Sequence, residues 1–230
     1  ANGGWTRHDI VSWDPPLFGE LYSFFCGGLA SGDLDGDGDP DLVVSYQENE
    51  ALEVDGDGRV VWLSSDGTPA NGGWTTEPLV DWTTDRAYCE LVPADLDRDG
   101  DLDLVLARYD NDAEDADNVQ WAENDGTPGV GFWSRRQLAN ITDSVNAPAV
   151  ADFDRDGDLD VAVADGHYLF NPTELRWLEN DGAPGDGGWI TRTVAAAGYY
   201  RYIMPADVDR DGDVDLVSYG NWYENDGTPA

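Results

Sequence analysis

The chain has 230 residues, of which 48 are acidic and only 12 basic, so its formal net charge at pH 7 is −36. So anionic a surface excludes nucleic acid as a partner, and no segment has the apolar length needed for membrane insertion. The length is sufficient for one substantial hydrophobic core, and we therefore expect a single domain over residues 1–230.

A nine-residue string of alternating carboxylates occurs four times, at residues 33–41, 95–103, 152–160 and 207–215. Five acidic side chains in so short a string repel one another unless a cation lies among them. Hard oxygen donors in this number suit calcium, whereas magnesium needs a tighter and more hydrated octahedron. The spacing offers oxygens from string positions 1, 3, 5 and 9, and a backbone oxygen from position 7. The glycines expected to turn the loop around the ion are Gly36, Gly100, Gly157 and Gly212.

The residues around each string have the pattern of β-strands. The continuations are short and β-branched, such as DLVVSY from Asp41 and DVAVAD from Asp160, and they lack the helical spacing that follows an EF-hand loop. An apolar segment precedes each string. A strand carrying Trp or Tyr follows roughly twenty residues later and runs into an Asp-Gly turn, a glycine-rich link and a strand led by Trp. Each repeat therefore predicts four strands.

The first aspartates of successive strings are 62, 57 and 55 residues apart. Four strands at such a period are typical of a propeller blade. We therefore predict an all-β propeller of four blades, each with four antiparallel strands. From Asp207 through both chain ends to Asp33 the count is 56, and the C-terminal NDGTPA continues into the N-terminal ANGGWT as it does inside blade one. This continuity predicts that the N-terminal strand, residues 5–11, is the outer strand of the last blade.

These strings and their flanks resemble the FG-GAP or VCBS-type calcium-binding repeat of integrin α-subunit propellers and many secreted bacterial proteins. The shared motif is DxDxDGxxD between a strand ending in a small residue, as in Pro93-Ala94, and a second apolar strand. The resemblance covers essentially the whole chain. Propellers of this family usually have about seven blades, so the chain is either a compact four-bladed ring or one segment of a larger protein.

The resemblance implies about four Ca²⁺ ions, one in each blade. The implied side-chain ligands are Asp33, Asp35, Asp37 and Asp41; Asp95, Asp97, Asp99 and Asp103; Asp152, Asp154, Asp156 and Asp160; and Asp207, Asp209, Asp211 and Asp215. The residues implied to contribute a backbone oxygen are Asp39, Asp101, Asp158 and Asp213.

The calcium loops and the two cysteines bear on location. Extracellular loops of this type bind calcium at about 10⁻⁴ to 10⁻³ M, so we expect a secreted or cell-surface protein. Cys26 and Cys89 occupy nearly equivalent places on the inner strands of neighbouring blades. They form either a disulfide between the blades or two buried free thiols, and a one-residue offset between them could point the side chains apart.

Ten tryptophans recur along the chain. We interpret two series as packing between blades, and three further tryptophans as surface residues outside those series. The first series is Trp5, Trp74, Trp133 and Trp189, the second is Trp62, Trp121 and Trp177, and the surface group is Trp13, Trp82 and Trp222.

The sequence contains no nucleophilic triad, phosphate-cradling loop or zinc spacing, and we predict that the chain is not an enzyme. Two functions from different classes are left. The first is a structural or adhesion protein, the subunit of an extracellular filament or layer, in which the N-terminal strand completes a blade of a neighbouring copy head to tail. The alternative is a carbohydrate- or protein-binding module that uses a propeller face as a rigid platform.

Overall fold

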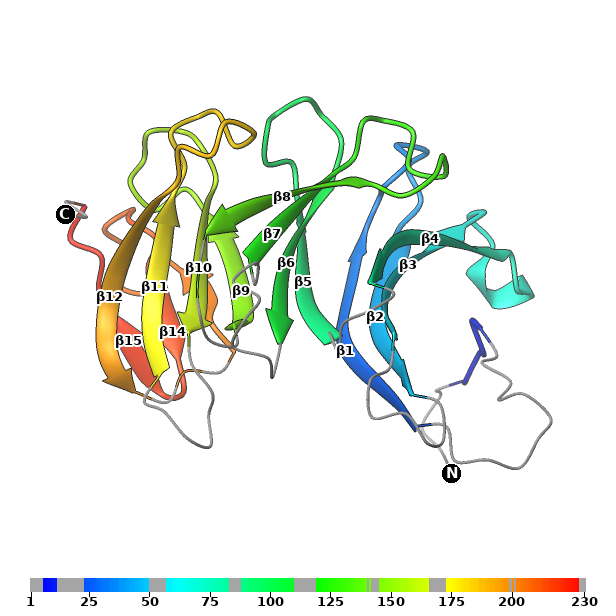
Figure 1. Ribbon diagram of the computed structural model, residues 1–230, viewed down its shortest axis with the longest axis horizontal. Helices are drawn as coiled ribbons and strands as arrows, with labels where there is room; N and C mark the ends of the chain where they lie inside the picture. The colour runs from blue at the N-terminus through cyan, green and yellow to red at the C-terminus, as the bar shows by residue number, and fades with distance from the viewer. Residues whose placement is uncertain are drawn as a thin grey trace.

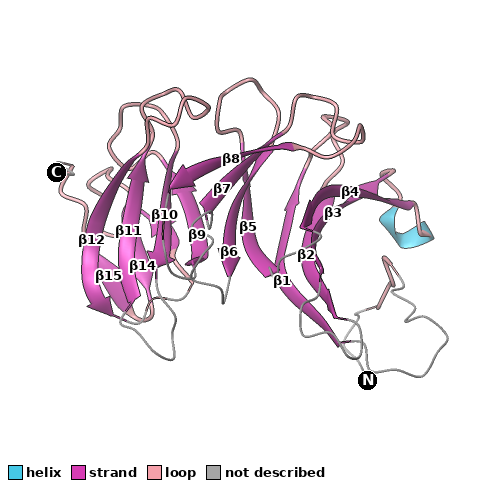
Figure 2. Cartoon of the chain, viewed as in Figure 1, coloured by secondary structure: helices cyan, strands magenta, loops and turns pink. Residues whose placement is uncertain are grey.

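The computed structural model describes residues 6–11, 23–49, 57–82, 88–109, 119–139, 141, 145–165, 173–198, 200 and 202–227. Nearly all of the regular structure in these ranges is β-strand, and the strands form four antiparallel sheets (Figure 1, Figure 2). One short 3₁₀ turn, Pro69–Asn71, lies between two strands. Within the described ranges no helix is long and apolar enough to cross a bilayer.

Each sheet is one blade, and its strands are neighbours in chain order. Blade 1 comprises β1 (Ser23–Gly32), β2 (Asp41–Asn49), β3 (Asp57–Ser65) and β4 (Trp74–Trp82). Blade 2 comprises β5 (Tyr88–Ala94), β6 (Asp103–Tyr109), β7 (Val119–Glu123) and β8 (Ser134–Ala139). Blade 3 comprises β9 (Val145–Ala151), β10 (Asp160–Asp165), β11 (Thr173–Glu179) and β12 (Ile190–Gly198). Blade 4 comprises β13 (Met204–Ala206), β14 (Asp215–Ser218) and β15 (Asn221–Tyr223). The prediction of an all-β propeller with four blades is confirmed.

The hydrophobic core lies between the blades. The inner strands β1, β5, β9 and β13 contact one another in succession, and three apolar clusters fill the three junctions between consecutive blades. Strand β10 is buried along its whole length, because it lies inside its sheet and is also covered by the neighbouring blades. Burial on both faces explains why the strands after each acidic string are apolar at successive positions rather than alternating. In Figure 1 blade 1 lies at the right of the view and blade 4 at the left, where β14 and β15 lie behind the strands of blade 3, and the inner strands of blades 1 and 4 are not among the strand pairs in close contact.

The prediction that the N-terminal strand completes blade 4 is wrong for the described part of that segment. Residues 6–11 form no strand, Trp5 lies outside the described residues, and the sheet of blade 4 has three strands among those described. Figure 1 shows residues 6–11, in dark blue, on the blade 1 side of the molecule and β15 on the opposite side. Because the inner strands of blades 1 and 4 are not in close contact, the segment does not reach the sheet that it was predicted to complete.

Of the two alternatives for Cys26 and Cys89, the disulfide is not formed. Cys89 is a fully buried free thiol, and burial raises its pKa to about 12. Strand β1 lies close to β5 at Gly27, where an added Cβ would lie 2.6 Å from the carbonyl oxygen of Cys89. The one-residue offset thus brings a glycine to Cys89. The alternative of a buried free thiol is confirmed for Cys89, whereas the side chain of Cys26 lies outside the described residues.

Candidate calcium sites

Each acidic string connects the first and second strands of a blade, at the edge where the third strand also ends. The carboxylate at position 9 opens the second strand and is buried. Its Oδ2 accepts the backbone N–H of string position 2 at 3.0 to 3.1 Å, and its Oδ1 accepts an N–H from the residue that follows or ends the third strand, or from the turn just beyond it, at 2.8 Å. The residues at this position are Asp41, Asp103, Asp160 and Asp215, at most 1% exposed. This carboxylate therefore joins the loop to the Asp-Gly turn of the same blade.

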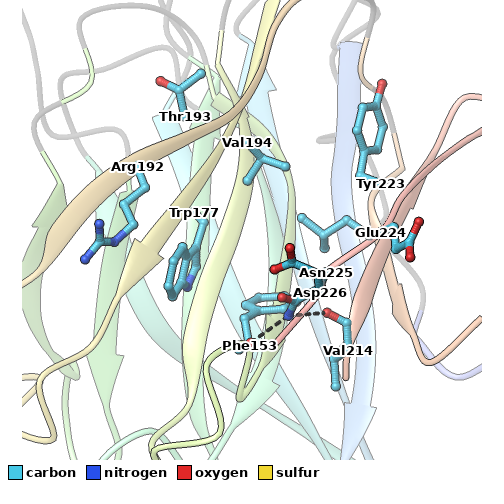
Figure 3. Close-up of a pocket in the computed structure, with 11 residues that line it drawn as sticks. Phe153, Trp177, Arg192, Thr193, Val194, Val214, Tyr223, Glu224, Asn225 and Asp226 are labelled. Carbon is cyan, nitrogen blue, oxygen red and sulfur yellow. Dashed lines mark hydrogen bonds between the residues drawn. The ribbon is translucent and has the colours of Figure 1, made fainter. Parts of the chain in front are cut away.

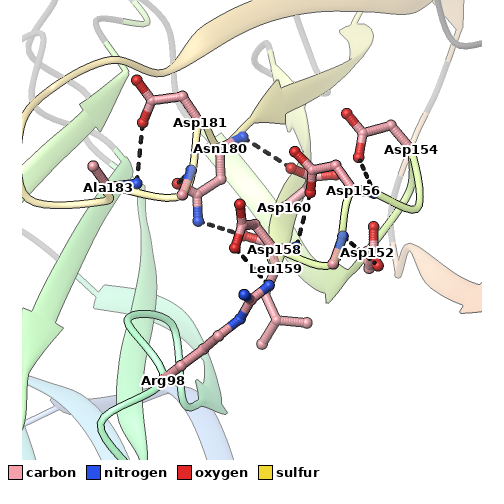
Figure 4. A network of polar contacts seen from close by, with 12 residues as sticks. Arg98, Asp152, Asp154, Asp156, Asp158, Leu159, Asp160, Asn180, Asp181 and Ala183 are labelled. Atoms are coloured by element: carbon pink, nitrogen blue, oxygen red, sulfur yellow. Dashed lines mark hydrogen bonds and ion pairs between the residues drawn. The ribbon is translucent and has the colours of Figure 1, made fainter.

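The earlier carboxylates fold the loop with one oxygen each. Oδ1 at position 3 accepts the N–H of position 5, and Oδ1 at position 5 accepts that of position 7. In the first three loops, Oδ2 at position 1 accepts the N–H of position 6 at 3.0 to 3.2 Å. Figure 4 shows this arrangement around Asp152, Asp154 and Asp156.

The second oxygen at position 1 is the clearest sign of a ligand. In Asp33, Asp95 and Asp152 the Oδ1 atom is buried and has no hydrogen-bond partner. A buried acceptor that is left unpaired costs about 1–3 kcal/mol, and more when it carries charge. The same side chain type at the same position in three loops therefore fits a cation held inside each loop.

In every loop, three carboxylates bring an oxygen within 4.8 Å of one another. The groups are Asp33, Asp35 and Asp37; Asp95, Asp97 and Asp99; Asp152, Asp154 and Asp160; and Asp207, Asp209 and Asp215. All of these residues belong to the predicted side-chain ligand sets. Only hard oxygen donors converge in these groups, which suits a calcium-type ion, and the acidic clusters are thus able to hold metal ions.

The electrostatics of the loops favour the same chemistry. Burial raises the pKa of Asp103 and of Asp160 to about 7, because the ionised form loses its water. Burial also raises the pKa of Asp35, Asp97 and Asp154, where neighbouring carboxylates act in the same direction. A cation beside these groups would favour their ionised form and offset both effects.

The backbone of the loop differs from the prediction at one residue. Position 6 of the first string is Gly38, with φ of 93°, and not Gly36. Its equivalents Gly100, Gly157 and Gly212 have φ of 103°, 97° and 96°. Gly36 stands at position 4, which is also left-handed, and three arginines adopt that conformation in the other loops. These are Arg98, Arg155 and Arg210, with φ of 63°, 62° and 68°.

Two of the position-4 arginines connect the loops of neighbouring blades. Arg98 of blade 2 pairs with Asp158 of blade 3 at 2.5 Å, and Arg155 of blade 3 pairs with Asp213 of blade 4 at 2.5 Å (Figure 4 shows the first pair). The position-7 side chains of the last two loops, Asp158 and Asp213, are therefore used between blades. Their predicted backbone contribution to an ion stays a prediction. Sequence reasoning missed these pairs, although an arginine recurs at position 4 of three strings.

The tryptophan series agree with packing between blades. Trp62, Trp121 and Trp177 are buried, and the indole N–H of Trp74, Trp133 and Trp189 donates to a proline carbonyl five residues earlier. The assignment of Trp222 is wrong in one part: it is exposed as predicted, but it does not lie outside the series. Trp222 opposes Val217 on the neighbouring strand just as Trp121 opposes Val105, so it is a fourth member of the second series. Trp82 is described only in its backbone, and Trp13 lies outside the described residues.

Fold and loops together define a β-propeller whose blades each carry an acidic loop between the first two strands. The family model of the FG-GAP-like repeat matches residues 33–106 and 95–163, more than half of the chain. The chain belongs to the FG-GAP-like repeat family.

Solved structures show the same fold. A rhamnogalacturonan lyase PL11 of Bacillus licheniformis has a TM-score of 0.51 and 16% identity over 90% of this chain. The exotype rhamnogalacturonan lyase YesX has a TM-score of 0.50 and 17% identity, also over 90%. This chain spans 42% and 40% of the length of these two proteins. No curated protein matches the chain in sequence.

Proposed function

We propose that the chain is a calcium-stabilised β-propeller that acts outside the cell as a structural or assembly protein. The aspartates at positions 1, 3, 5 and 9 of each string would hold one Ca²⁺, about four in all. The observation that carries this proposal is the set of buried, unpartnered oxygens of Asp33, Asp95 and Asp152. When bound, calcium supplies positive charge that holds the acidic loop closed. The proposal includes no catalytic residue.

Calcium binding of this kind is coupled to folding. The three carboxylates of each group lie within 4.8 Å of one another only when the loop is folded, so the ion binds the native chain and not the unfolded one. Each position-9 carboxylate also fixes the Asp-Gly turn of its blade. An ion that stabilises the loop therefore stabilises the whole edge of the blade.

The charge of the chain supports an extracellular setting. Four Ca²⁺ ions add eight positive charges, so the net charge changes from −36 to −36 + 8 = −28. Dissolved salt outside the cell screens such repulsion. Loops of the extracellular kind have dissociation constants of about 10⁻⁴ to 10⁻³ M, which match the calcium available there.

Calorimetric titration of the chelator-treated protein tests this proposal together with thermal unfolding. We expect saturable binding of about four Ca²⁺ with dissociation constants of about 10⁻⁴ to 10⁻³ M, and a melting temperature that rises with calcium. Sodium chloride at equal ionic strength is the control, because simple screening of the net charge also stabilises an acidic chain. A melting temperature that responds equally to both salts, with no saturable heat of binding, would contradict calcium stabilisation.

A second candidate function is carbohydrate binding, and two exposed tyrosines favour it. Tyr202 and Tyr219 are 78% and 74% exposed, and the pairing of Met204 with Val217 places both at the same end of blade 4. Aromatic side chains at one edge could stack against sugar rings. Because two proteins of this fold are rhamnogalacturonan lyases by name, rhamnogalacturonan fragments are the first ligands to test, followed by a glycan array in calcium. Loss of any binding in Tyr202→Ala and Tyr219→Ala, with Phe132→Ala as control, would support this role.

A further inference from the structure

One tryptophan position is buried in three blades and exposed in the fourth. Trp62, Trp121 and Trp177 are 6%, 2% and 5% exposed, because the next blade covers each of them. Trp222 holds the equivalent position in blade 4 and is 44% exposed. Blade 4 thus exposes a surface that the other blades bury against their next neighbour. We call it the trailing face and define it by Trp222 and Arg210.

Blade 1 exposes one residue whose equivalents in the other three blades are buried. Leu29 lies four residues before its acidic string and is 66% exposed. The residues at the same place in blades 2, 3 and 4 are buried: Leu91 is 7% exposed, Pro148 is buried and Ile203 is 9% exposed. Leu91 and Ile203 belong to the apolar clusters shared with the preceding blade. Blade 1 thus exposes the surface that the other blades bury against their preceding neighbour. We call it the leading face and define it by Leu29 and Asp39.

The trailing face carries an arginine and the leading face an aspartate at the two loop positions that pair between the other blades. At the junction of blades 2 and 3 and at the junction of blades 3 and 4, the position-4 arginine of one loop pairs with the position-7 aspartate of the following loop, as Arg155 pairs with Asp213. Arg210 is the position-4 arginine of the last loop and is exposed, with no ion pair among the described residues. Asp39 is the position-7 aspartate of the first loop. A blade 1 stacked on the trailing face would place these two residues as the next pair of the series.

A pocket at the junction of blades 3 and 4 adds an independent observation. At the junction of blades 1 and 2, Trp133 precedes the outer strand and donates its backbone N–H to the carbonyl of Leu79 at 3.0 Å. Its side chain packs in the cluster that contains Trp62. The equivalent of Leu79 in blade 3 is Val194. Leu79 is 0% exposed and Val194 is 40% exposed. Val194 and Trp177 line a cavity of about 180 Å³ between β12 and β15 (Figure 3).

The N-terminal sequence resembles the start of an outer strand led by Trp, the element that the described part of blade 4 lacks beside this pocket. Residues 2–6, NGGWT, repeat residues 71–75, which lead the outer strand of blade 1. A strand that begins at Trp5 could pair with the open edge of β15 and place its indole against Val194. Residues 6–11 of the same chain lie on the opposite side of the molecule from β15 (Figure 1), so within one copy they do not reach this pocket.

We propose that blade 4 is the docking surface for a second copy of this chain. The second copy adds its N-terminal strand, beginning at Trp5, to β15 and stacks its leading face on the trailing face, with Arg210 beside its Asp39. The interface is heterologous, so repeated addition gives a ring or a filament. This inference rests on the assembly role proposed above and names the surfaces that perform it.

Mixing two variants tests the head-to-tail geometry. Leu29→Arg disables the leading face and Trp222→Arg disables the trailing face, and both positions are exposed in the monomer, so the fold is retained. In calcium, analytical ultracentrifugation should show assembly of the wild type and only monomers of each variant alone. An equimolar mixture should form a one-to-one dimer, because each variant keeps the face that the other has lost. Phe132→Arg, at an exposed aromatic position of the blade 2 link, is the matched control and should assemble like the wild type.

Two further variants probe the details. Trp5→Ala should weaken association about 30-fold or more, the effect of removing a buried aromatic anchor. Arg210→Glu should weaken it about three- to tenfold, as for an ion pair near the surface.

Several outcomes would overturn the inference. A wild-type protein that calcium stabilises but that stays monomeric at every concentration would do so, and would leave the calcium part of the proposed function intact. Assembly that persists in both single variants would show that copies associate through another surface. A mixture that yields no dimer would exclude the head-to-tail geometry.

Discussion

The negative charge at position 1 of a loop should stabilise the fold in calcium and should lose or reverse that effect when calcium is removed. Asp95→Asn keeps an oxygen for the N–H of Gly100 but removes one of the five carboxylates of its loop. With free calcium at ten times the dissociation constant, one site contributes RT ln 11, or about 1.4 kcal/mol. If the variant loses this contribution, its melting temperature in calcium should fall by about 3–6 °C, since 1 kcal/mol corresponds to about 2–4 °C in a chain of this size.

In excess EDTA the same variant should be as stable as the wild type or more stable. The wild-type Asp95 then holds a buried, unpartnered oxygen among the neighbouring carboxylates. The amide of asparagine would instead donate hydrogen bonds to those neighbours and would reduce their repulsion.

Calorimetry or circular dichroism in both buffers measures these differences. The control is Glu77→Gln, which removes a charge from an exposed position on β4 and should change the two melting temperatures little and equally. An equal loss in calcium and in EDTA would refute the argument, because Asp95 would then act only through its hydrogen bond to the loop backbone.

The other predictions concern the core, the thiol and the junctions. Leu79→Ala should cost about 3–5 kcal/mol because Leu79 is fully buried, whereas Val194→Ala, at the equivalent and 40% exposed position, should cost under about 1.5 kcal/mol in the monomer by denaturant titration. In a Cys26→Ser background, the thiol of Cys89 should not react with a thiol reagent at pH 8, since it is buried and its pKa is about 12; fast labelling in calcium would contradict its burial. Arg155→Ala should lower the free energy of unfolding by about 1 kcal/mol, with the loss reduced at high salt; a loss that salt does not change would point to packing instead of the ion pair.

The repeated features of the fold were predictable from the sequence because they are local. An acidic string followed by DLVVSY or DVAVAD fixes a loop and a strand within about fifteen residues, and the Asp-Gly turn fixes the next hairpin edge. The ligand groups follow from the same strings, since positions 1 and 3 converge with position 5 in the first two loops and with position 9 in the last two. Recurrence at a nearly constant period then indicates one blade per string.

The predictions that were wrong about strand completion and the disulfide concern contacts between blades, which no single repeat determines. Strand completion by residues 5–11 requires blade 1 and blade 4 to touch, and no pattern within one repeat reports how far four blades extend around a ring. The disulfide required the side chains of neighbouring inner strands to face each other, but Gly27 is the residue that approaches Cys89. The error at Trp222 has another origin. An alignment of ENDG in blades 2 and 4 places Trp222 with Trp121, so the signal was present in the sequence.

The calcium loops and the blade junctions depend on each other through the same arginines. Arg98 and Arg155 reach the next loop from left-handed backbone positions. Such a conformation is unfavourable for a residue other than glycine or asparagine, and the surrounding structure must hold it in place. The loop is that structure. A cation that stabilises the loop therefore also holds each arginine toward the following blade. In the assembly proposed above, the blade that follows Arg210 belongs to a second copy, so calcium should favour both the folding of each copy and the contact between copies.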